Sequence, residues 1–271
     1  MAAEIAGGFA FRSLALLTDA VHLLTDVSGL AIALLAIGLQ ARPITERHSF
    51  GLQRAEVLAA QANAFILIGV TIVIAVEAVR RLVTPADVSG AGLAIVAAGG
   101  LAVNLGCSRL LHDVAGRSLN MRGAFLHLAL DAAGSLAALL AGVAILLWSV
   151  PRADPVASLL IGALVLWAAW RLLVDTMHVL LEGTPVGLDP AGVERAIVDH
   201  GGVESVHHLH LWSLASDVPA LSAHVVLSGE LSLHDAQVRG DGVKAMLAER
   251  FGIDHATLEL ECHRDHPEPE F

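Results

Sequence analysis

Two histidine–aspartate pairs stand inside apolar segments of the chain, each pair with a spacing of four residues. His22 and Asp26 lie in LLTDAVHLLTDVSGL, and His127 and Asp131 lie in AFLHLALDAAGSL. A spacing of four residues is about one helical turn, so the members of each pair share one helix face. Two imidazole nitrogens and two carboxylate oxygens form the tetrahedral four-ligand set that zinc favours. We therefore expect the two pairs to hold one divalent cation.

The alternative is that each pair is a local hydrogen bond packed between helices. A carboxylate at the centre of a membrane costs about 2.5–3.5 kcal/mol on insertion scales, and a bound cation would compensate this cost directly. Two identical pairs on separate segments favour the metal interpretation. Asp19 lies one turn nearer the membrane surface than His22, and for it we expect a structural or gating role.

A second group of chemically capable side chains lies in the last third of the chain. Its members lie on three predicted strands: His207, His208, His210, His224, Glu259 and Glu261. Residues two apart on a regular strand share a face, so we expect His208 and His210 to point one way and His207 the other. The tail then adds Cys262, His263 and His266, a density typical of a zinc-capable segment. The alternative is a disordered end that contains histidines without binding metal.

The elements that must position these residues fall into two classes. Apolar helices are expected at about 14–39, 54–82, 89–111, 122–150 and 154–181, each long enough to cross a hydrocarbon core of about 30 Å. The breaks contain proline, glycine or charge, at Arg42-Pro43, Thr84-Pro85, Gly116-Arg117 and Pro151-Arg152. After Pro185 the pattern becomes mixed and polar. We expect a transmembrane cation-transport domain at 1–184 and a metal-binding, dimerising domain at 185–271.

The segment MAAEIAGGFAF at the start resembles only the tail of another helix. At 1.5 Å per residue it reaches about 16 Å, roughly half of a bilayer. We therefore expect a first span that is truncated, with the native protein beginning upstream of Met1. The competing expectation is a protein of five and a half spans.

The expected second domain is a small α+β fold. A helix capped at Asp189 runs to His200, strands follow at 206–214 and 221–228, a helix at about 233–250 and a last strand at 256–261. This order suits a small α+β sandwich with an antiparallel or mixed sheet.

Composition excludes several classes of protein. Because 55% of the chain is hydrophobic, we expect a membrane protein. The net charge of −11 argues against nucleic-acid binding, which requires a basic patch. Its two cysteines fall in different expected domains and predict no disulfide. Arginines are slightly more frequent around the loops on one side of the expected membrane domain. This bias predicts that these loops and the C-terminal domain face the cytosol. The membrane would then be the inner or plasma membrane of the cell.

Five ordered motifs resemble the cation diffusion facilitators, and the zinc-transporting branch in particular. They are SLALLTDAVHLLTD, RHSFGLQRAEVL, SLNMRGAFLHLALDAAGS, LLEGTP and VHHLHLWSL…LSAHVVL. The resemblance covers nearly the whole chain. It implies six membrane spans, a homodimer, a cytosolic ferredoxin-like domain and exchange of metal for protons.

The resemblance also implies roles for individual residues. The transport site maps onto His22, Asp26, His127 and Asp131. A dimer-interface metal site maps onto His207, His224 and Glu261. Many relatives have a further metal site in the loop after the second span. Here His48 is retained, but Thr45 and Leu52 replace other ligands, so a site there would have to use Glu46 with His48. Arg54 and Glu182 match a charge pair that ties the membrane helices to the cytosolic domain.

Ligand chemistry predicts the cargo and the mechanism. Imidazole favours zinc, with cadmium and cobalt also suitable, over magnesium and calcium. Histidine must be neutral to bind metal, so loading releases protons and protonation ejects the ion. A membrane metalloenzyme would need an open coordination position, which four protein ligands do not leave, so we expect no enzyme. The remaining alternative is a non-transporting metal sensor or scaffold of the same fold.

Overall fold

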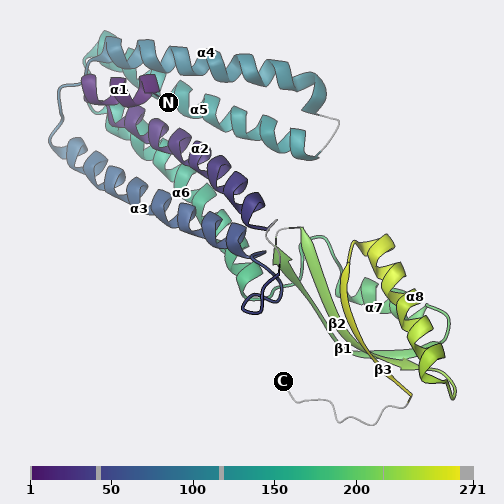
Figure 1. The fold of residues 1–271 in the computed structure, drawn as a ribbon. Coiled ribbons are helices and arrows are strands. Elements are labelled where there is room, and N and C mark those ends of the chain that lie inside the picture. The colour runs from purple at the N-terminus through teal and green to yellow at the C-terminus, as the bar shows by residue number, and fades with distance from the viewer. Residues whose placement is uncertain (1, 41–43, 116–118, 216, 263–271) are drawn as a thin grey trace. The chain divides into compact units, whose positions relative to one another are not determined.

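The computed structural model describes residues 2–40, 44–115, 119–215 and 217–262, without the side chains of residues 33, 36, 37, 40, 111–115 and 119–127 (Figure 1). The chain divides into two compact units. One contains residues 1–34 and 60–173, and the other contains residues 35–59 and 174–271.

The N-terminal part of the chain is helical. Its elements are α1 (Ala2–Ala10), α2 (Leu14–Gln40), α3 (Ala55–Val83), α4 (Gly90–Ala115), α5 (Leu119–Trp148) and α6 (Ala153–Leu180). Among the described residues, five of these helices are long and apolar enough to cross a membrane, which confirms the five expected spans. Large apolar side chains such as Leu34, Ile95 and Leu146 are exposed on them, as lipid-facing positions require.

Helices α4 and α5 approach each other closely because glycine stands at the contact. A Cβ atom at Gly142 of α5 would lie 2.7 Å from the backbone nitrogen of Ala94 in α4, and one at Gly90 would lie 2.8 Å from the backbone nitrogen of Leu146. Small residues at such positions let helix backbones pack in direct contact inside a membrane. The half-buried amide of Asn104 in α4 also donates to the hydroxyl of Ser135 in α5 at 3.5 Å, which adds an interhelical hydrogen bond.

The C-terminal part is a small α+β domain. It contains α7 (Pro190–Val198), β1 (Val203–Ala215), β2 (Val218–Leu227), α8 (Leu233–Phe251) and β3 (His255–Glu261). The strands form a mixed sheet in the order β1-β2-β3, in which β1 and β2 are antiparallel and β2 and β3 are parallel. Figure 1 shows α7 and α8 together on one face of this sheet. The predicted helix cap is confirmed, because the Asp189 carboxylate accepts a hydrogen bond from the backbone of Ala191.

A β-bulge interrupts β1 among its histidines. His207 pairs with His224 and His210 pairs with Ser222, so His208 and Leu209 together face Ala223 alone. His208 has a left-handed backbone, with φ of 50°. The expected strict alternation of side chains along this strand was therefore wrong, because the sequence-based argument assumed a regular strand.

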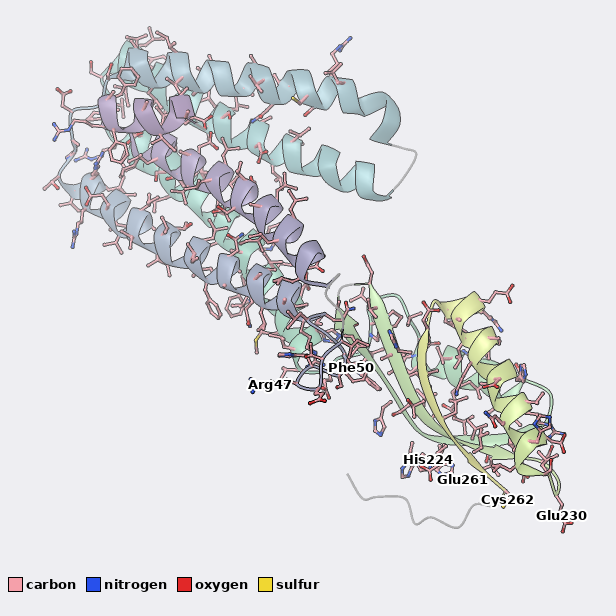
Figure 2. All side chains as sticks on the ribbon, viewed as in Figure 1. Arg47, Phe50, His224, Glu230, Glu261 and Cys262 are labelled. Atoms are coloured by element: carbon pink, nitrogen blue, oxygen red, sulfur yellow. The ribbon has the colours of Figure 1, made fainter. Side chains whose placement is uncertain are left out.

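The segment after α2 belongs to the same compact unit as the C-terminal domain, and Figure 2 labels two of its side chains, Arg47 and Phe50. The Phe50 ring packs edge-on against His255 with ring centroids 6.4 Å apart. Arg54 donates to a carboxylate oxygen of Glu182 at 3.1 Å, at a largely exposed position.

Candidate metal centres

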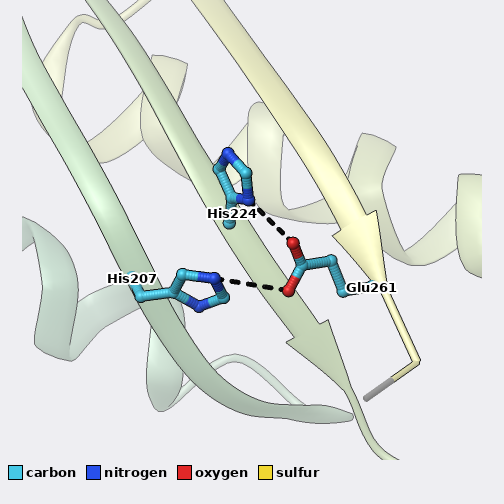
Figure 3. Close-up of side chains that lie close together, drawn as sticks. All are labelled: His207, His224 and Glu261. Carbon is cyan, nitrogen blue, oxygen red and sulfur yellow. Dashed lines mark hydrogen bonds and ion pairs between the residues drawn. The ribbon is translucent and has the colours of Figure 1, made fainter. Parts of the chain in front are cut away.

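Three potential ligands meet on the sheet face opposite to α7 and α8. The neighbours of these residues on the strands identify the face. Val206, Ala223 and Val225 are buried in the core beneath the helices. Because adjacent residues of a strand point to opposite faces, His207 and His224 project from the other side. Glu261 of β3 reaches them from the neighbouring strand. The sheet thus brings one residue from each strand to a single point, as Figure 3 shows.

The distances within this group, which we call the sheet centre, are short. Nδ1 of His224 lies 2.7 Å from one oxygen of Glu261, and Nε2 of His207 lies 3.4 Å from the other. One ligand atom from each residue can be chosen so that all lie within 4.8 Å of one another. A tetrahedral zinc with bonds of about 2.0–2.1 Å would hold ligand atoms roughly 3.3 Å apart. The 2.7 Å contact would therefore lengthen on ion binding, while the 3.4 Å contact already has about that length.

Other predicted members of the sheet group lie around this point. Nε2 of His224 lies 3.5 Å from an oxygen of Glu259, whose side chain is mostly exposed. Cys262 follows Glu261 at the end of the described chain (Figure 2). His263 and His266 lie outside the described residues.

A second group, which we call the membrane centre, joins α2 to α5. Nε2 of His22 lies 3.1 Å from Oδ1 of Asp131 and 3.9 Å from Oδ2 of Asp26. The Asp131 side chain is only 6% exposed, so a carboxylate has been placed deep between apolar helices. His22, Asp26 and Asp131 form the other group of described residues whose geometry could hold an ion.

A small cavity adjoins the membrane centre. It has a volume of about 60 Å³ and is lined by His22, Asp131 and the buried Asp19, with Gly134 and Ile161 among the remaining walls. Space for about one ion or a few waters is therefore available beside the ligand atoms. Asp19 lies at this cavity, beside the three residues that could hold an ion.

The fourth predicted member of the membrane centre, His127, stands in α5 one turn before Asp131. Its side chain lies outside the described part of the structure, so its ligand role stays a prediction. His48 lies in a turn after α2, where its Nδ1 is 3.4 Å from the Thr45 hydroxyl. Among the described residues it joins no group of three potential ligands, and its role in a loop site stays a prediction.

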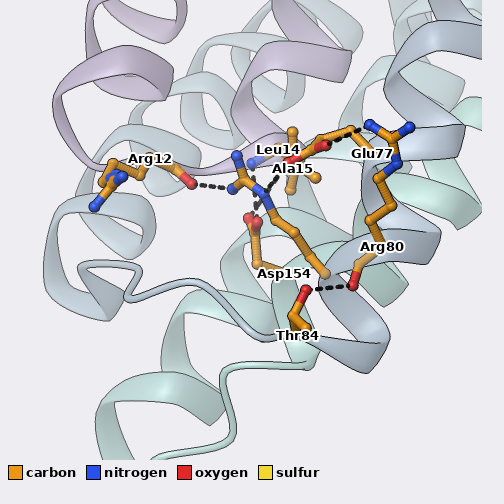
Figure 4. Close-up of polar contacts among 8 residues, drawn as sticks. Arg12, Leu14, Ala15, Glu77, Arg80, Thr84 and Asp154 are labelled. Atoms are coloured by element: carbon orange, nitrogen blue, oxygen red, sulfur yellow. Dashed lines mark hydrogen bonds and ion pairs between the residues drawn. The ribbon is translucent and has the colours of Figure 1, made fainter.

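The N-terminus of α2 is fixed by an acid that the sequence analysis did not single out. The fully buried carboxylate of Asp154, at the start of α6, accepts a hydrogen bond from the Ser13 hydroxyl. It also accepts from the backbone N–H groups of Leu14 at 2.9 Å and Ala15 at 3.2 Å (Figure 4). Ser13 in turn accepts from the backbone of Leu16 as the helix cap. A serine directly before an apolar run predicts a helix cap. The sequence does not predict that a carboxylate from a distant helix also bonds to this helix end.

Polar contacts nearby join the same ends of the helices. Arg81 of α3 donates to the carbonyl oxygen of Arg12 and, at 3.1 Å, to Glu77 (Figure 4). The Thr18 and Ser158 hydroxyls are 2.7 Å apart, one turn further along α2 and α6. The helix that carries His22 and Asp26 is therefore held at one end by buried polar bonds.

Comparison with known families identifies the class of this protein. Residues 1–181 match the family model described as the cation efflux transmembrane domain, and residues 185–263 match the cation efflux protein, cytoplasmic domain. The chain belongs to the cation efflux family, which the motifs of the sequence had indicated.

Individual relatives match over almost the whole chain. The zinc transporter ZitB of Shigella flexneri is 40% identical over 269 residues, covering 97% of this chain and 85% of its own length. The metal cation efflux system protein CzcD of Cupriavidus metallidurans is 40% identical over 259 residues, covering 96% and 81%. The cadmium, cobalt and zinc/H(+)-K(+) antiporter of Bacillus subtilis is 36% identical over 263 residues, covering 96% and 84%.

Among solved structures, the metal-bound C-terminal domain of the CzcD transporter is 36% identical to the matched part of this chain. It covers 27% of this chain and 99% of that domain, with a TM-score of 0.25.

Proposed function

We propose that this protein exports zinc-class divalent cations across the cell membrane in exchange for protons, holding the ion between α2 and α5. The observation that carries the proposal is the convergence of His22, Asp26 and Asp131 from two apolar helices, with His22 Nε2 3.1 Å from the Asp131 carboxylate. His127, one turn from Asp131, would complete a four-ligand set. The relatives named as zinc transporters and as an antiporter for cadmium, cobalt and zinc support the same cargo.

The ligand types supply both selectivity and coupling. Imidazole nitrogens favour zinc, cadmium and cobalt over the hard ions magnesium and calcium. His22 must be neutral to bind the ion, so a proton that binds its ring competes with the metal. A site exposed alternately to the two sides of the membrane then exchanges one for the other.

We also propose that the protein is a homodimer in the inner or plasma membrane and that its C-terminal domain lies in the cytosol. In this domain zinc acts as a regulatory ion at the sheet centre. The family description of this region as a cytoplasmic domain supports the orientation. The grouping of His207, His224 and Glu261 supports metal binding. An ion that binds only one arrangement of the domain stabilises that arrangement by mass action, which gives cytosolic zinc a way to regulate export.

Zinc-driven proton flux in proteoliposomes tests the transport site. Asp26→Asn and Asp131→Asn each remove a charged ligand with little change in volume, and each should lower saturable flux by at least about 100-fold, more than the loss of a supporting group around a metal site. Asp87→Asn makes the same chemical change at an exposed position between α3 and α4 and should leave flux unchanged.

Near-normal flux in both site variants would contradict the assignment of the membrane centre. A parent protein that moves none of zinc, cadmium and cobalt would instead support the non-transporting sensor or scaffold. These two failures are distinguishable because the second appears without any substitution.

A further inference from the structure

The bulge in β1 places two consecutive histidines on the same side of the sheet. Val206 and Leu209 both pack into the core beneath α7 and α8, and the two residues between them are His207 and His208. In a regular strand one of these two would point into the core. Here His208 has the left-handed backbone of the bulge, which is disfavoured for a residue with a side chain.

The three imidazole rings therefore form a compact cluster. The ring centroid of His208 lies 5.0 Å from that of His224 and 5.1 Å from that of His207, and the other two rings are 5.1 Å apart. Each ring thus contacts both of the others. His208 lies directly beside the sheet centre, although regular alternation would have sent it to the opposite face.

The nitrogens of this cluster are buried with few partners. Nε2 of His208 and both ring nitrogens of His207 are shielded from solvent, and none of them makes a hydrogen bond within the described part of the chain. Buried polar atoms in native proteins normally have a partner, and a missing one calls for a water or an ion. A cation between the rings and Glu261 would give a partner to Nε2 of His208 and to one of the two ring nitrogens of His207.

We propose that His208 is a further ligand of the sheet centre, so that three imidazoles and the Glu261 carboxylate hold one ion. This inference rests on the proposed metal binding by the C-terminal domain and deepens it. Four protein ligands make the closed tetrahedral set of a structural zinc site, drawn from all three strands. Three neutral nitrogens also favour zinc and cobalt over manganese. The unfavourable backbone of His208 is then retained because it keeps the ring on the ion's side of the sheet. His208 stands outside the group of three whose ligand atoms already lie within 4.8 Å of one another, so its ring must move closer when the ion binds.

The test uses the full-length protein in detergent, with Asp26→Asn and Asp131→Asn in every sample to disable the membrane centre. Zinc affinity is measured by competition with a chromophoric chelator, and coordination by the visible absorption of bound cobalt(II).

His208→Asn removes the imidazole while keeping a residue that tolerates a left-handed backbone. His210→Asn is the matched control, because His210 is exposed and lines a separate cavity. Unfolding without metal verifies that each variant folds.

We expect His208→Asn to weaken zinc binding by at least about tenfold and to change the cobalt spectrum, since the loss of even a supporting group costs that much at metal sites. His210→Asn should match the parent in both measurements. If His208→Asn binds zinc as tightly as the parent with an unchanged cobalt spectrum, His208 is no ligand.

A fourth variant, Glu261→Gln, separates the inference from the function on which it rests. Weakened zinc binding in Glu261→Gln together with unchanged binding in His208→Asn would overturn only the role of His208. A parent sample that binds no zinc once the membrane centre is disabled would overturn the proposed sheet centre as well.

Discussion

Replacing Asp154 by alanine tests how the helix of the membrane centre is held in place. The Asp154 carboxylate is fully buried and bonds to the Ser13 hydroxyl and to the first two N–H groups of α2, those of Leu14 and Ala15. Helix N-terminal N–H groups have no partner within their own helix, so an outside acceptor must satisfy them. Alanine offers none.

The structure sets the size of the effect. Two backbone donors would lose their acceptor in a buried position, and each costs about 1–3 kcal/mol. The serine hydroxyl can rotate to another partner, so we count only the two N–H groups and expect a loss of about 3 kcal/mol in unfolding free energy. Asp154→Asn keeps one carbonyl acceptor and should lose about 1 kcal/mol, because asparagine also serves as a helix cap.

The assay is a steady-state titration with SDS, followed by far-UV circular dichroism, for the parent and for both Asp154 variants. Asp87→Ala removes a carboxylate at an exposed position and serves as the control. Transport by Asp154→Ala should also fall, since a displaced α2 would carry His22 away from Asp131. Equal stability of the alanine and asparagine variants, or a loss below about 1 kcal/mol for alanine, would refute this account of the cap.

Three further predictions concern other parts of the molecule. His127→Asp should shift the transport preference toward manganese because it replaces a nitrogen ligand with oxygen; an unchanged rank order of metals in vesicle uptake would contradict this. Residues 185–271 expressed alone should fold, and zinc should strengthen their association with one another. Light scattering would show this as a rise in mass when zinc is added, and an unchanged mass would count against regulation by this domain. Gly142→Ala should destabilise the protein by about 1–3 kcal/mol through overpacking against α4. Gly99→Ala, where an added Cβ meets nothing within 4 Å, should not.

The membrane helices were predictable because residues close to each helix end determine where it begins and ends. Apolar runs end where proline or charge interrupts them, and the predicted starts of α2, α4 and α6 lie within one residue of the observed ones. Asp189 was likewise readable as a cap because its partner, Ala191, is two residues away. Local signals of this kind depend on one segment at a time.

The sequence predicted the meeting of α2 and α5 only in part. The spacing of His22 and Asp26 implies a shared helix face, and the structure places Asp131 beside them. Spacing alone does not reveal that Asp154 would close the end of α2, since the two segments are about 140 residues apart and the carboxylate has no local pattern. Partners of this type are set by helix packing.

The direction of His208 was not predictable from alternation. A bulge changes the face of every residue after it by one position, and its site depends on how β1 pairs with β2. Histidine carries no signal for a left-handed backbone as strong as that of glycine, so neither the bulge nor the three-ring cluster was apparent in VHHLHLW.

The glycine contact between α4 and α5 lies far enough from Asp131 that a small tilt of α5 about this contact would displace the Asp131 carboxylate. At Gly142 of α5 the two helices approach so closely that an added Cβ would meet the backbone of Ala94 in α4. Asp131 lies about 11 residues from Gly142, or roughly 16 Å along the helix. A rigid-body tilt of about 10° with its pivot at that contact would move the Asp131 carboxylate by about 3 Å. A movement of that size is comparable with the 3.1 Å that now separates it from His22, so a modest tilt of α5 would separate these two proposed ligands.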